Sequence, residues 1–248
     1  MGLSGADVMK LVDHTILKPY STREDVRKVF QEAISFGCYS ICVNPVYVGF
    51  ARSLVDDSGA ALRVCSVIDF PFGAMDTESR VEAIARAAAN GADEVDIVAP
   101  ITLVKSGRWA EVSRDLSRVV RAAHGEGLVI KVIVEDAYTT RDEKLKLYEI
   151  VATSGADFIK TSTGFEDREY ASSIGNRPGA QADNVRLMAE VTNKYNPSLG
   201  IKAAGGIRTL RQVQELLEAS GRPPDPSKFR IGTSAAASIW RDVSLGRA

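Results

Sequence analysis

The feature that most constrains the fold is a repeat, in which short β-branched runs alternate with longer amphipathic stretches along the chain. We predict eight strands, at Val12–Ile16, Ser40–Val43, Arg63–Ile68, Glu94–Val98, Val129–Val134, Phe158–Thr161, Gly200–Ala203 and Phe229–Gly232. Several of these runs are almost entirely apolar, which is typical of parallel strands covered on both faces. Eight strands alternating with helices in 248 residues predict an α/β fold, a single-domain (β/α)₈ TIM barrel over residues 1–248.

Helix start and stop signals support this alternation. Capping residues followed by acids open the predicted helices at Ser21–Asp25, Asp76–Ser79 and Thr140–Glu143. Gly91 and Gly155 each follow a helical pattern and suit a left-handed helix C-cap. The alternative is an open doubly wound sheet, which more often carries a glycine-rich dinucleotide-binding turn after an early strand, and the sequence has none.

Composition excludes several classes of function. The net charge is −1, with acids and bases interspersed, so there is no basic footprint for nucleic acid or an anionic membrane. No apolar run reaches the length of a bilayer span, and Met1–Val8 lacks the pattern of a signal peptide. Cys38, Cys42 and Cys65 are interpreted as reduced thiols of a cytoplasmic protein, and without a second Cys or His pair they predict no zinc site.

Four charged residues interrupt otherwise apolar strands: Asp96, Lys131, Lys160 and Lys202. Alternation along the strand makes Glu94 and Asp96 point to the same side. One interpretation is a buried ion-pair network that fills the barrel. The four together favour catalysis, because desolvated charges are costly unless they are matched or used. In a barrel, residues at the carboxyl ends of strands face the active site.

Lys160 offers the chemistry of an amine nucleophile. Burial favours the neutral form of a lysine, and a neutral amine attacks carbonyl carbons to form Schiff bases. Three hydroxyl residues and a glycine, Thr161–Gly164, follow it and leave room for a bound carbonyl compound. Lys202, one strand later, is predicted to keep Lys160 neutral by like-charge repulsion, and Asp96 to relay protons.

Two glycine turns predict a phosphate site. Gly205–Thr209 joins the seventh strand to a helix, and Ile231–Ala235 joins the eighth strand to the last one. Glycines let backbone amides approach an anion, and the loops after strands seven and eight are a common phosphate site in such barrels. The alternative is two ordinary turns, with Arg208 either reaching the phosphate or solvated at a helix start.

Other residues are expected to have structural roles. We predict that His14 is a hydrogen-bonded structural histidine, that Cys42 is a small core residue, and that Trp109 and Trp240 pack helices. The polar stretch Glu166–Ala182 breaks the repeat after the Lys160 strand. A long loop on that face is more often functional or mobile than a domain linker.

Six phrases of the sequence resemble the deoxyribose-phosphate aldolases, a family of class I aldolases. They run in family order over residues 13 to about 235, at Asp13–Pro19, Val43–Pro45, Phe70–Gly73, Glu94–Asp96, Lys160–Phe165 and Lys202–Arg208. The resemblance implies a TIM barrel that interconverts 2-deoxy-D-ribose 5-phosphate with D-glyceraldehyde 3-phosphate and acetaldehyde.

The resemblance also implies roles for individual residues. Lys160 would form the Schiff base, Lys202 would perturb it, and Asp96 would assist proton transfer. Asp13 would lie near the sugar end of the pocket, and the phosphate would lie among Gly164, Gly205, Gly206, Gly232 and Ser234. We expect no metal or cofactor, phosphosugar and aldehyde substrates, no nucleic-acid or membrane partner, and a homo-oligomer, either a dimer or a tetramer.

The chain departs from the family pattern at three places. Asp69 stands where the family usually has glycine, residues 166–179 form a longer segment, and Leu245–Ala248 replaces the terminal tyrosine of some members. Two other functions stay open. One is a class I aldolase that uses the same lysine on a longer phosphosugar, and the other is a non-catalytic phosphosugar-binding barrel.

Overall fold

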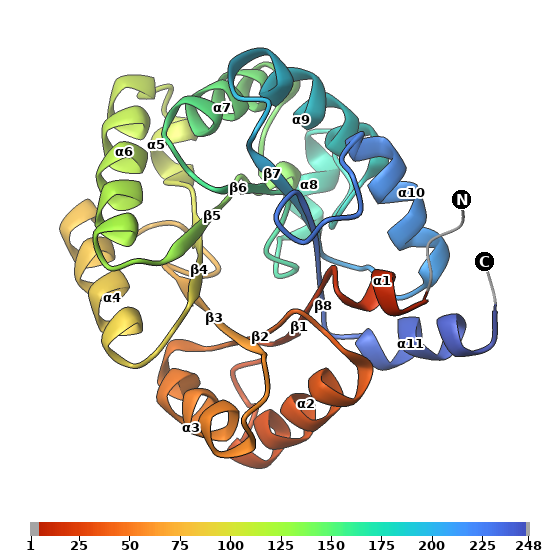
Figure 1. The fold of residues 1–248 in the computed structure, drawn as a ribbon. Helices are drawn as coiled ribbons and strands as arrows, with labels where there is room; N and C mark the ends of the chain where they lie inside the picture. The colour runs from red at the N-terminus through yellow and green to blue at the C-terminus, as the bar shows by residue number, and fades with distance from the viewer. Residues whose placement is uncertain (1–4, 247–248) are drawn as a thin grey trace.

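The computed structural model describes residues 5–246, and the sequence predictions for Met1–Val8 and Leu245–Ala248 fall partly outside that range. Eight parallel strands form one closed barrel in the order β1 to β8, and β8 pairs with β1 to close it. Figure 1 looks into the ring of strands, with the helices arranged around it. The predicted barrel is confirmed.

The strand boundaries agree with the sequence prediction to within one residue. The strands are β1 (Val12–Ile16), β2 (Ser40–Val43), β3 (Arg63–Ile68), β4 (Glu94–Val98), β5 (Val129–Ile133), β6 (Phe158–Lys160), β7 (Gly200–Ala204) and β8 (Phe229–Thr233). Almost every residue in them is buried, as expected for a parallel sheet covered by helices.

Helices connect successive strands and cover the outside of the barrel (Figure 1). Within residues 5–246 they are α1 (Gly5–Met9), α2 (Arg23–Phe36), α3 (Val48–Ser58), α4 (Thr77–Ala89), α5 (Ile101–Lys105), α6 (Trp109–Gly125), α7 (Arg141–Thr153), α8 (Arg168–Ser173), α9 (Ala182–Tyr195), α10 (Leu210–Ser220) and α11 (Ala236–Ser244). Two 3₁₀ helices, η1 (Pro45–Tyr47) and η2 (Asp136–Tyr138), follow β2 and β5. No helix in this range has both the length and the apolar character needed to cross a bilayer.

The predicted helix signals act as expected. Thr22 and Thr140 each accept a hydrogen bond from the amide three residues later, in full capping boxes, and Asp76 accepts one from the Ser79 amide. Such caps stabilise a helix by about 1 kcal/mol each. Gly91 and Gly155 follow α4 and α7 with φ of 90° and 89°, the left-handed conformation predicted for them.

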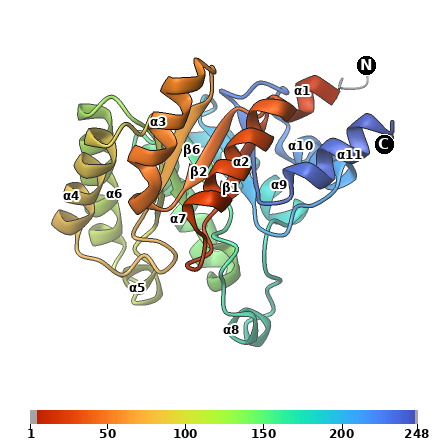
Figure 2. The same ribbon diagram turned by 90° about the horizontal axis from the view of Figure 1, so that it is seen from below.

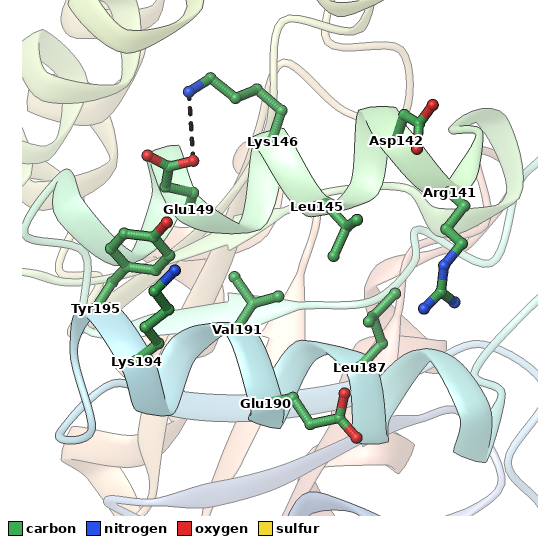
Figure 3. Close-up of a pocket in the computed structure, with 10 residues that line it drawn as sticks. All are labelled: Arg141, Asp142, Leu145, Lys146, Glu149, Leu187, Glu190, Val191, Lys194 and Tyr195. Atoms are coloured by element: carbon green, nitrogen blue, oxygen red, sulfur yellow. Dashed lines mark hydrogen bonds and ion pairs between the residues drawn. The ribbon is translucent and has the colours of Figure 1, made fainter.

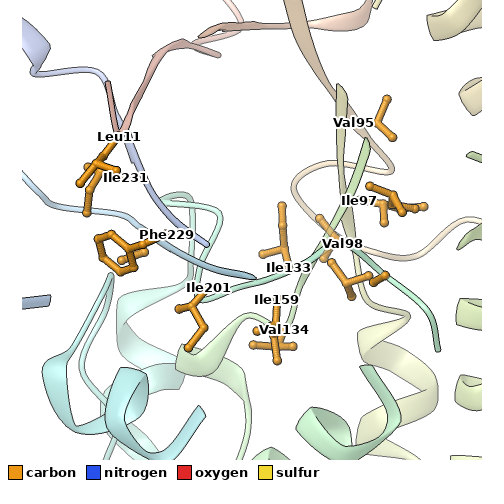
Figure 4. Close-up of a cluster of buried hydrophobic side chains, with 14 of the residues drawn as sticks. Leu11, Val95, Ile97, Val98, Ile133, Val134, Ile159, Ile201, Phe229 and Ile231 are labelled. Carbon is orange, nitrogen blue, oxygen red and sulfur yellow. The ribbon is translucent and has the colours of Figure 1, made fainter. Parts of the chain in front are cut away.

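The strands separate an apolar layer from a charged one. Residues that point outward, such as Val95, Ile97 and Ile201, form the core between the strands and the helices (Figure 4). The alternate residues point inward and include Asp96, Lys160 and other charged groups. The barrel interior is therefore polar at its centre, and the helices rather than the interior bury most of the apolar surface.

The segment predicted as one long loop after β6 contains helix α8, so that prediction was wrong in detail. The Asp167 side chain caps this helix by accepting hydrogen bonds from the amides of Glu169 and Tyr170. Asn176 then anchors the segment, because its amide donates to the carbonyl oxygens of Asp136, Ala137 and Thr139. Figure 2 shows α8 standing out from the barrel at the end where the β6 loop emerges.

Candidate active site

Lys160 lies at the end of β6, inside the barrel and close to its mouth. Its register partner on the neighbouring strand β7 is Lys202. Lys160 is 4% exposed, and its Nζ donates a hydrogen bond to Oδ2 of Asp96 at 2.7 Å. The sequence prediction that these three residues lie together therefore agrees with the observed geometry.

Asp96 is the centre of the charged cluster. Its carboxylate accepts hydrogen bonds from Lys160, from Lys202 at 2.8 Å and from Lys131 at 3.0 Å. Burial alone would raise the pKa of Asp96, but the three lysine charges outweigh that effect and hold its pKa well below the usual value. Asp96 is therefore ionised in the resting protein and connects Lys160 directly to Lys202.

The cluster continues into the lower barrel. Lys202 Nζ also contacts Asp13 at 2.6 Å, and Lys131 Nζ contacts Glu94 at 2.6 Å. Arg230 bonds to both Asp13 and Glu94 and so closes the network. Burial would lower the pKa of Lys202, but the charges of Asp13 and Asp96 raise it well above the ordinary value. Asp13 is itself fully buried and acts here as an ion partner, while its predicted contact with the sugar stays a prediction.

The network has one more cation than it has carboxylates. Lys131, Lys160, Lys202 and Arg230 face the carboxylates of Asp13, Glu94 and Asp96. The buried ion-pair network that formed the structural alternative is thus present. An unmatched positive charge in a buried site is costly, and loss of one ammonium proton would balance the cluster. Lys160 is the most exposed of the four cations.

An apolar group lines the barrel mouth beside these charges. It consists of the buried residues Leu17, Cys42, Cys65 and Val67, with Phe70 and Phe165 packed against it. The rings of Phe70 and Phe165 meet edge to face with centroids 5.4 Å apart, and Lys18 Nζ lies 4.6 Å from the Phe165 centroid. Cys42 is a small buried residue, as predicted. Such surroundings suit a short aliphatic aldehyde.

One set of side chains among residues 5–246 brings metal-compatible donor atoms together: Cys42, Cys65 and Asp96, all within 4.8 Å of one another. The place is already occupied by a cation. Lys131 Nζ lies 3.5 Å from the Cys65 sulfur and 3.0 Å from Asp96 Oδ1. Ammonium groups on these donors disfavour a metal ion, so the structure gives no argument for one.

The glycines predicted to bind phosphate gather at the carboxyl ends of β6 and β7. Gly164, Gly205 and Gly206 all have left-handed backbones, with φ of 81°, 94° and 76°. A Cβ added to Gly164 would lie 3.8 Å from the Gly205 Cα, which places the two turns side by side. Thr233 Oγ1 donates to the Ile207 carbonyl at 2.6 Å and ties the loop after β8 to the loop after β7.

The two helices that follow these turns differ at their N-termini. The α10 amides near its start are already used, because Gln212 Oε1 accepts from Arg208 N at 2.8 Å and from Thr209 N at 3.1 Å. Helix α11 has no side-chain cap, and Ser234 just before it is exposed. Of the two helix starts predicted to bind phosphate, α11 therefore has the freer amides.

Gly232 on β8 lies close to the Lys202 side chain. A Cβ at this position would be 3.0 Å from the Lys202 Cε and 3.0 Å from the Ala204 Cβ. Its backbone is not left-handed. A larger residue here would therefore press on the Lys202 side chain, whatever the relation of Gly232 to a phosphate. The predicted phosphate contact of Gly232 stays a prediction.

The sequence analysis did not identify the buried charges of Arg230 and Glu135, but it predicted the structural role of His14. Arg230 and Glu135 were overlooked, although each is a charge within or just after an apolar strand, the same signal that identified Lys131. His14 was expected to be structural. Its Nε2 lies 2.9 Å from Glu32 Oε2 and its Nδ1 lies 3.5 Å from the Thr233 carbonyl oxygen, so it joins α2 to the barrel.

Two surface grooves lie apart from the cluster around Asp96 and Lys160. One, of about 520 Å³, runs between the outer helices α7 and α9 over Leu145, Leu187 and Val191 (Figure 3). The other, of about 420 Å³, lies at the amino ends of the strands and includes Tyr39 and Arg230. Neither contains Lys160, and barrel active sites form at the opposite, carboxyl end of the strands.

Comparison with known proteins adds independent information. The sequence model of the DeoC/LacD family of aldolases matches residues 7–241. The deoxyribose-phosphate aldolase of Thermoplasma volcanium is 45% identical over 236 residues, covering 95% of this chain and 94% of that protein. Among solved structures, the aldolase QR15 is 34% identical with a TM-score of 0.82 and 97% coverage of both chains. The tetrameric deoxyribose phosphate aldolase of Aeropyrum pernix is 28% identical, with a TM-score of 0.81, covering 97% of this chain and 92% of that one.

Proposed function

The chain belongs to the DeoC/LacD family of aldolases, and from this premise we propose that it cleaves 2-deoxy-D-ribose 5-phosphate through an imine on Lys160. The products would be D-glyceraldehyde 3-phosphate and acetaldehyde, and the reaction would be reversible. The observation that carries the proposal is the Lys160 amine, which lies at the barrel mouth 2.7 Å from the Asp96 carboxylate. The proposal treats residues 1–248 as one catalytic domain.

The charge balance of the cluster supports a nucleophilic amine. Four cations share three carboxylates, so release of one proton leaves matched charges in the barrel. Lys202 is held in its charged form between Asp13 and Asp96, and Lys131 is likewise paired. The proton is therefore best lost from Lys160, where a carbonyl compound would arrive.

The bond changes follow from an amine at that position. The Lys160 nitrogen adds to C1 of the open-chain sugar, and loss of water leaves an iminium. The iminium draws the electrons of the C2–C3 bond toward nitrogen, while the C3 hydroxyl gives up its proton, so glyceraldehyde 3-phosphate departs and an enamine remains. Protonation of the enamine carbon and addition of water then release acetaldehyde and restore the amine.

Asp96 and Lys202 are placed to handle the protons of this sequence. Asp96 Oδ2 accepts from both lysines, at 2.7 Å from Lys160 and 2.8 Å from Lys202. A proton that leaves Lys160 can therefore move along one short hydrogen-bonded path. The left-handed glycines after β6 and β7, with the uncapped start of α11, would bind the 5-phosphate.

Covalent trapping tests the proposal. The protein is incubated with acetaldehyde and sodium borohydride, digested, and analysed by peptide mass spectrometry. We expect the reduced adduct on Lys160 alone, and no adduct or activity in Lys160→Arg, because arginine stays protonated and cannot form an imine. An adduct on another lysine, or full activity of Lys160→Arg, would contradict the proposal.

Product analysis separates the proposal from its rivals. Release of acetaldehyde from 2-deoxyribose 5-phosphate supports it, whereas release of dihydroxyacetone phosphate from a longer phosphosugar would favour the other aldolase. Binding of phosphosugar without any trapped adduct would favour a non-catalytic barrel. We also propose that the protein forms a homo-oligomer and acts in the cytoplasm, which gel filtration with light scattering and cell fractionation would test.

A further inference from the structure

Asn176 is a half-buried residue to which the proposed mechanism assigns no role. It lies in the segment 166–181, which leads from the turn after β6 to α9 and contains α8. Its side-chain amide donates hydrogen bonds to the carbonyl oxygens of Asp136, Ala137 and Thr139, at 3.1, 3.1 and 2.9 Å. These carbonyls belong to the loop after β5, so Asn176 joins that loop to the segment.

Lys144 fixes the orientation of the Asn176 amide. Its Nζ donates to Asn176 Oδ1 at 3.1 Å and to the Thr139 carbonyl oxygen at 2.7 Å. An ammonium group only donates and a carbonyl oxygen only accepts, so the Asn176 oxygen faces Lys144 and its NH₂ group faces the three carbonyls. Lys144 lies on α7 and is 4% exposed, and a polar group left without a partner at such a site is costly.

The chain that follows Asn176 is short and restrained. Pro178 has a fixed φ, and its carbonyl oxygen accepts from Gln181 Nε2 at 2.8 Å. Gly179 comes next, with a left-handed φ of 74°. Three residues span at most about 10 Å, so a shift of Asn176 is passed on to Gly179.

Gly179 and Ala180 lie directly on the turn that follows β7. The Ala180 amide donates to the Gly205 carbonyl oxygen at 3.0 Å. A Cβ added to Gly205 would lie 2.9 Å from the Gly179 Cα, and one added to Gly179 would lie 2.6 Å from the Gly205 carbonyl oxygen. The two backbones thus approach more closely than any side chain would allow. The position of the Gly205 turn therefore depends on where Gly179 and Ala180 are held.

The path from Asn176 thus ends at the turn that we propose binds the phosphate. An anion bound by backbone amides is bound more tightly when those amides are already in place, because less ordering is needed on binding. A side chain that fixes the turn would therefore raise the affinity for a phosphorylated substrate without touching it.

We propose that Asn176 is a positioning residue that sets the preference for a phosphorylated over an unphosphorylated substrate, by holding Gly179 and Ala180 against the Gly205 turn. The identity of the substrate rests on the proposed function. The coupling between Asn176 and the turn does not, because it follows from the hydrogen bonds and close contacts that join them.

Steady-state kinetics on two substrates test the preference. Asn176→Ala should lower kcat/KM for 2-deoxyribose 5-phosphate by about tenfold or more, and kcat/KM for unphosphorylated 2-deoxyribose by less than about twofold. An unchanged ratio of the two values, either because both fall equally or because neither falls, would overturn the inference.

Two further variants separate the bonds of the Asn176 amide. Asn176→Asp keeps the size of the side chain and the bond from Lys144 but removes the N–H donors, so it should act like Asn176→Ala. Lys144→Met leaves the three donated bonds in place and should lower the same ratio less, by about threefold. The preference of the unmodified protein in Asn176→Asp would contradict a role for the donated bonds.

Asn196→Ala is a matched control. Asn196 is also a half-buried asparagine, and its Oδ1 accepts from the amide and the hydroxyl of Ser198, at 3.2 and 2.6 Å. It precedes β7 at the opposite end of the barrel. Asn196→Ala should lose stability without a change in the ratio of the two substrates.

Hydrogen exchange followed by mass spectrometry tests the coupling without any substrate. In Asn176→Ala, peptides that cover residues 177–181 and 205–207 should both exchange faster than in the unmodified protein, because the Ala180 amide bonds to the Gly205 carbonyl. Faster exchange in 177–181 alone would overturn the inference.

Acetaldehyde carries no phosphate, so its trapping on Lys160 separates this inference from the proposed function. Trapping should be equal in the unmodified protein and in Asn176→Ala. No trapping in either would disprove the proposed function, and phosphorus-31 NMR with inorganic phosphate would then decide. Weaker phosphate binding in Asn176→Ala supports the inference, and equal binding overturns it. If Asn176→Ala does not fold, the milder Lys144→Met takes its place in each comparison.

Discussion

At the scale of single residues, Lys202 acts both as a like charge near Lys160 and as an ion partner. It contacts Asp13 at 2.6 Å and Asp96 at 2.8 Å, and both carboxylates favour its charged form. Removing its charge would leave Asp96 with fewer cations and so strengthen the hold of Asp96 on the Lys160 proton. Both effects act in the same direction, against a neutral Lys160 amine.

We therefore expect Lys202→Leu to lower activity near neutral pH. The rising limb of the pH–rate profile should move to higher pH, by about one pH unit or more. The measurement is kcat/KM for deoxyribose phosphate cleavage from pH 5 to pH 10. Lys228→Leu is a suitable control, because Lys228 lies in the loop before β8, at the opposite end of the barrel from Lys160, and its Nζ donates to the Ser198 carbonyl oxygen. An unchanged profile with good activity in Lys202→Leu would show that Lys202 is structural.

Asp69 is an aspartate in a backbone conformation that glycine adopts most easily. Its φ is 50°, in the left-handed region that favours glycine and that aspartate tolerates better than most residues. Its carboxylate accepts hydrogen bonds from the amides of Ala74 and Met75 and lies 3.5 Å from Arg80. The Asp69 side chain thus makes contacts at this turn that a glycine could not make.

At the scale of elements, the loops after β6, β7 and β8 form one assembly. Residues 166–181 form the segment that leads from the β6 turn to α9. Near its end, the Ala180 amide donates a hydrogen bond to the Gly205 carbonyl oxygen, and a Cβ added to Gly205 would lie 2.9 Å from the Gly179 Cα. This segment therefore packs against the turn that we propose binds the phosphate. Gly206, in the same turn, is not packed in this way, because no atom lies within 4 Å of a Cβ added to it.

Gly206→Val should raise KM for the phosphorylated substrate about tenfold or more and affect unphosphorylated 2-deoxyribose much less. The reason is conformational, since a β-branched residue resists the left-handed backbone, with φ of 76°, of the turn that we propose binds the phosphate. Both substrates are compared by steady-state kinetics. Remote binding energy also supports turnover, so kcat for the phosphorylated substrate should fall as well.

Gly127→Val provides the matched control for this prediction. Gly127 has a nearly identical φ of 74° and equally open space, but it precedes β5 at the opposite end of the barrel. It should show the same loss of stability without a preference for one substrate. Equal damage to both substrates in Gly206→Val would refute the phosphate assignment and leave the lysine chemistry intact. Gly232→Val is a poorer test, because its side chain would press on Lys202.

At the scale of the whole molecule, buried carboxyls give two opposing dependences of stability on pH. Asp13 and Asp96 have lowered pKa values, because lysine and arginine charges outweigh their burial. Their contribution is present above the unfolded pKa near 3.8 and is lost as the pH falls below it. Burial instead raises the pKa of Asp136 to about 7, so its contribution is present below about 4 and is lost as the pH rises to 7.

We therefore expect the free energy of unfolding to be greatest at mildly acidic pH and to fall toward pH 8. Asp136→Asn should remove part of that fall, by roughly 4 kcal/mol at most, the equivalent of a pKa change from 3.8 to about 7. Urea denaturation at pH 5 and pH 8 gives the difference. Asp142→Asn, at an exposed position on α7, should not alter it. A fall of the same size in Asp136→Asn would rule out Asp136 as its source.

The sequence alone determined the architecture, for a reason that is local in origin. Strand and helix periods, caps at Thr22 and Thr140 and left-handed glycines after helices are set by neighbouring residues, so they can be recognised without a structure. It also identified Lys160, Lys202 and Asp96, because a charge inside an apolar strand is conspicuous wherever it occurs. These three side chains do lie in direct contact.

Only the tertiary structure decided which charges pair and in what number. Arg230 and Asp13 lie 217 residues apart in the chain, yet they contact each other because β8 closes on β1. The room that Gly232 leaves for Lys202 and the anchoring of the segment 166–181 by Asn176 likewise depend on how neighbouring strands and their loops pack in space. The buried side-chain oxygens of Glu135 and Glu166 that lack a hydrogen-bond partner also depend on the tertiary structure. The sequence shows which groups can titrate, but only packing shows which of them lack a partner.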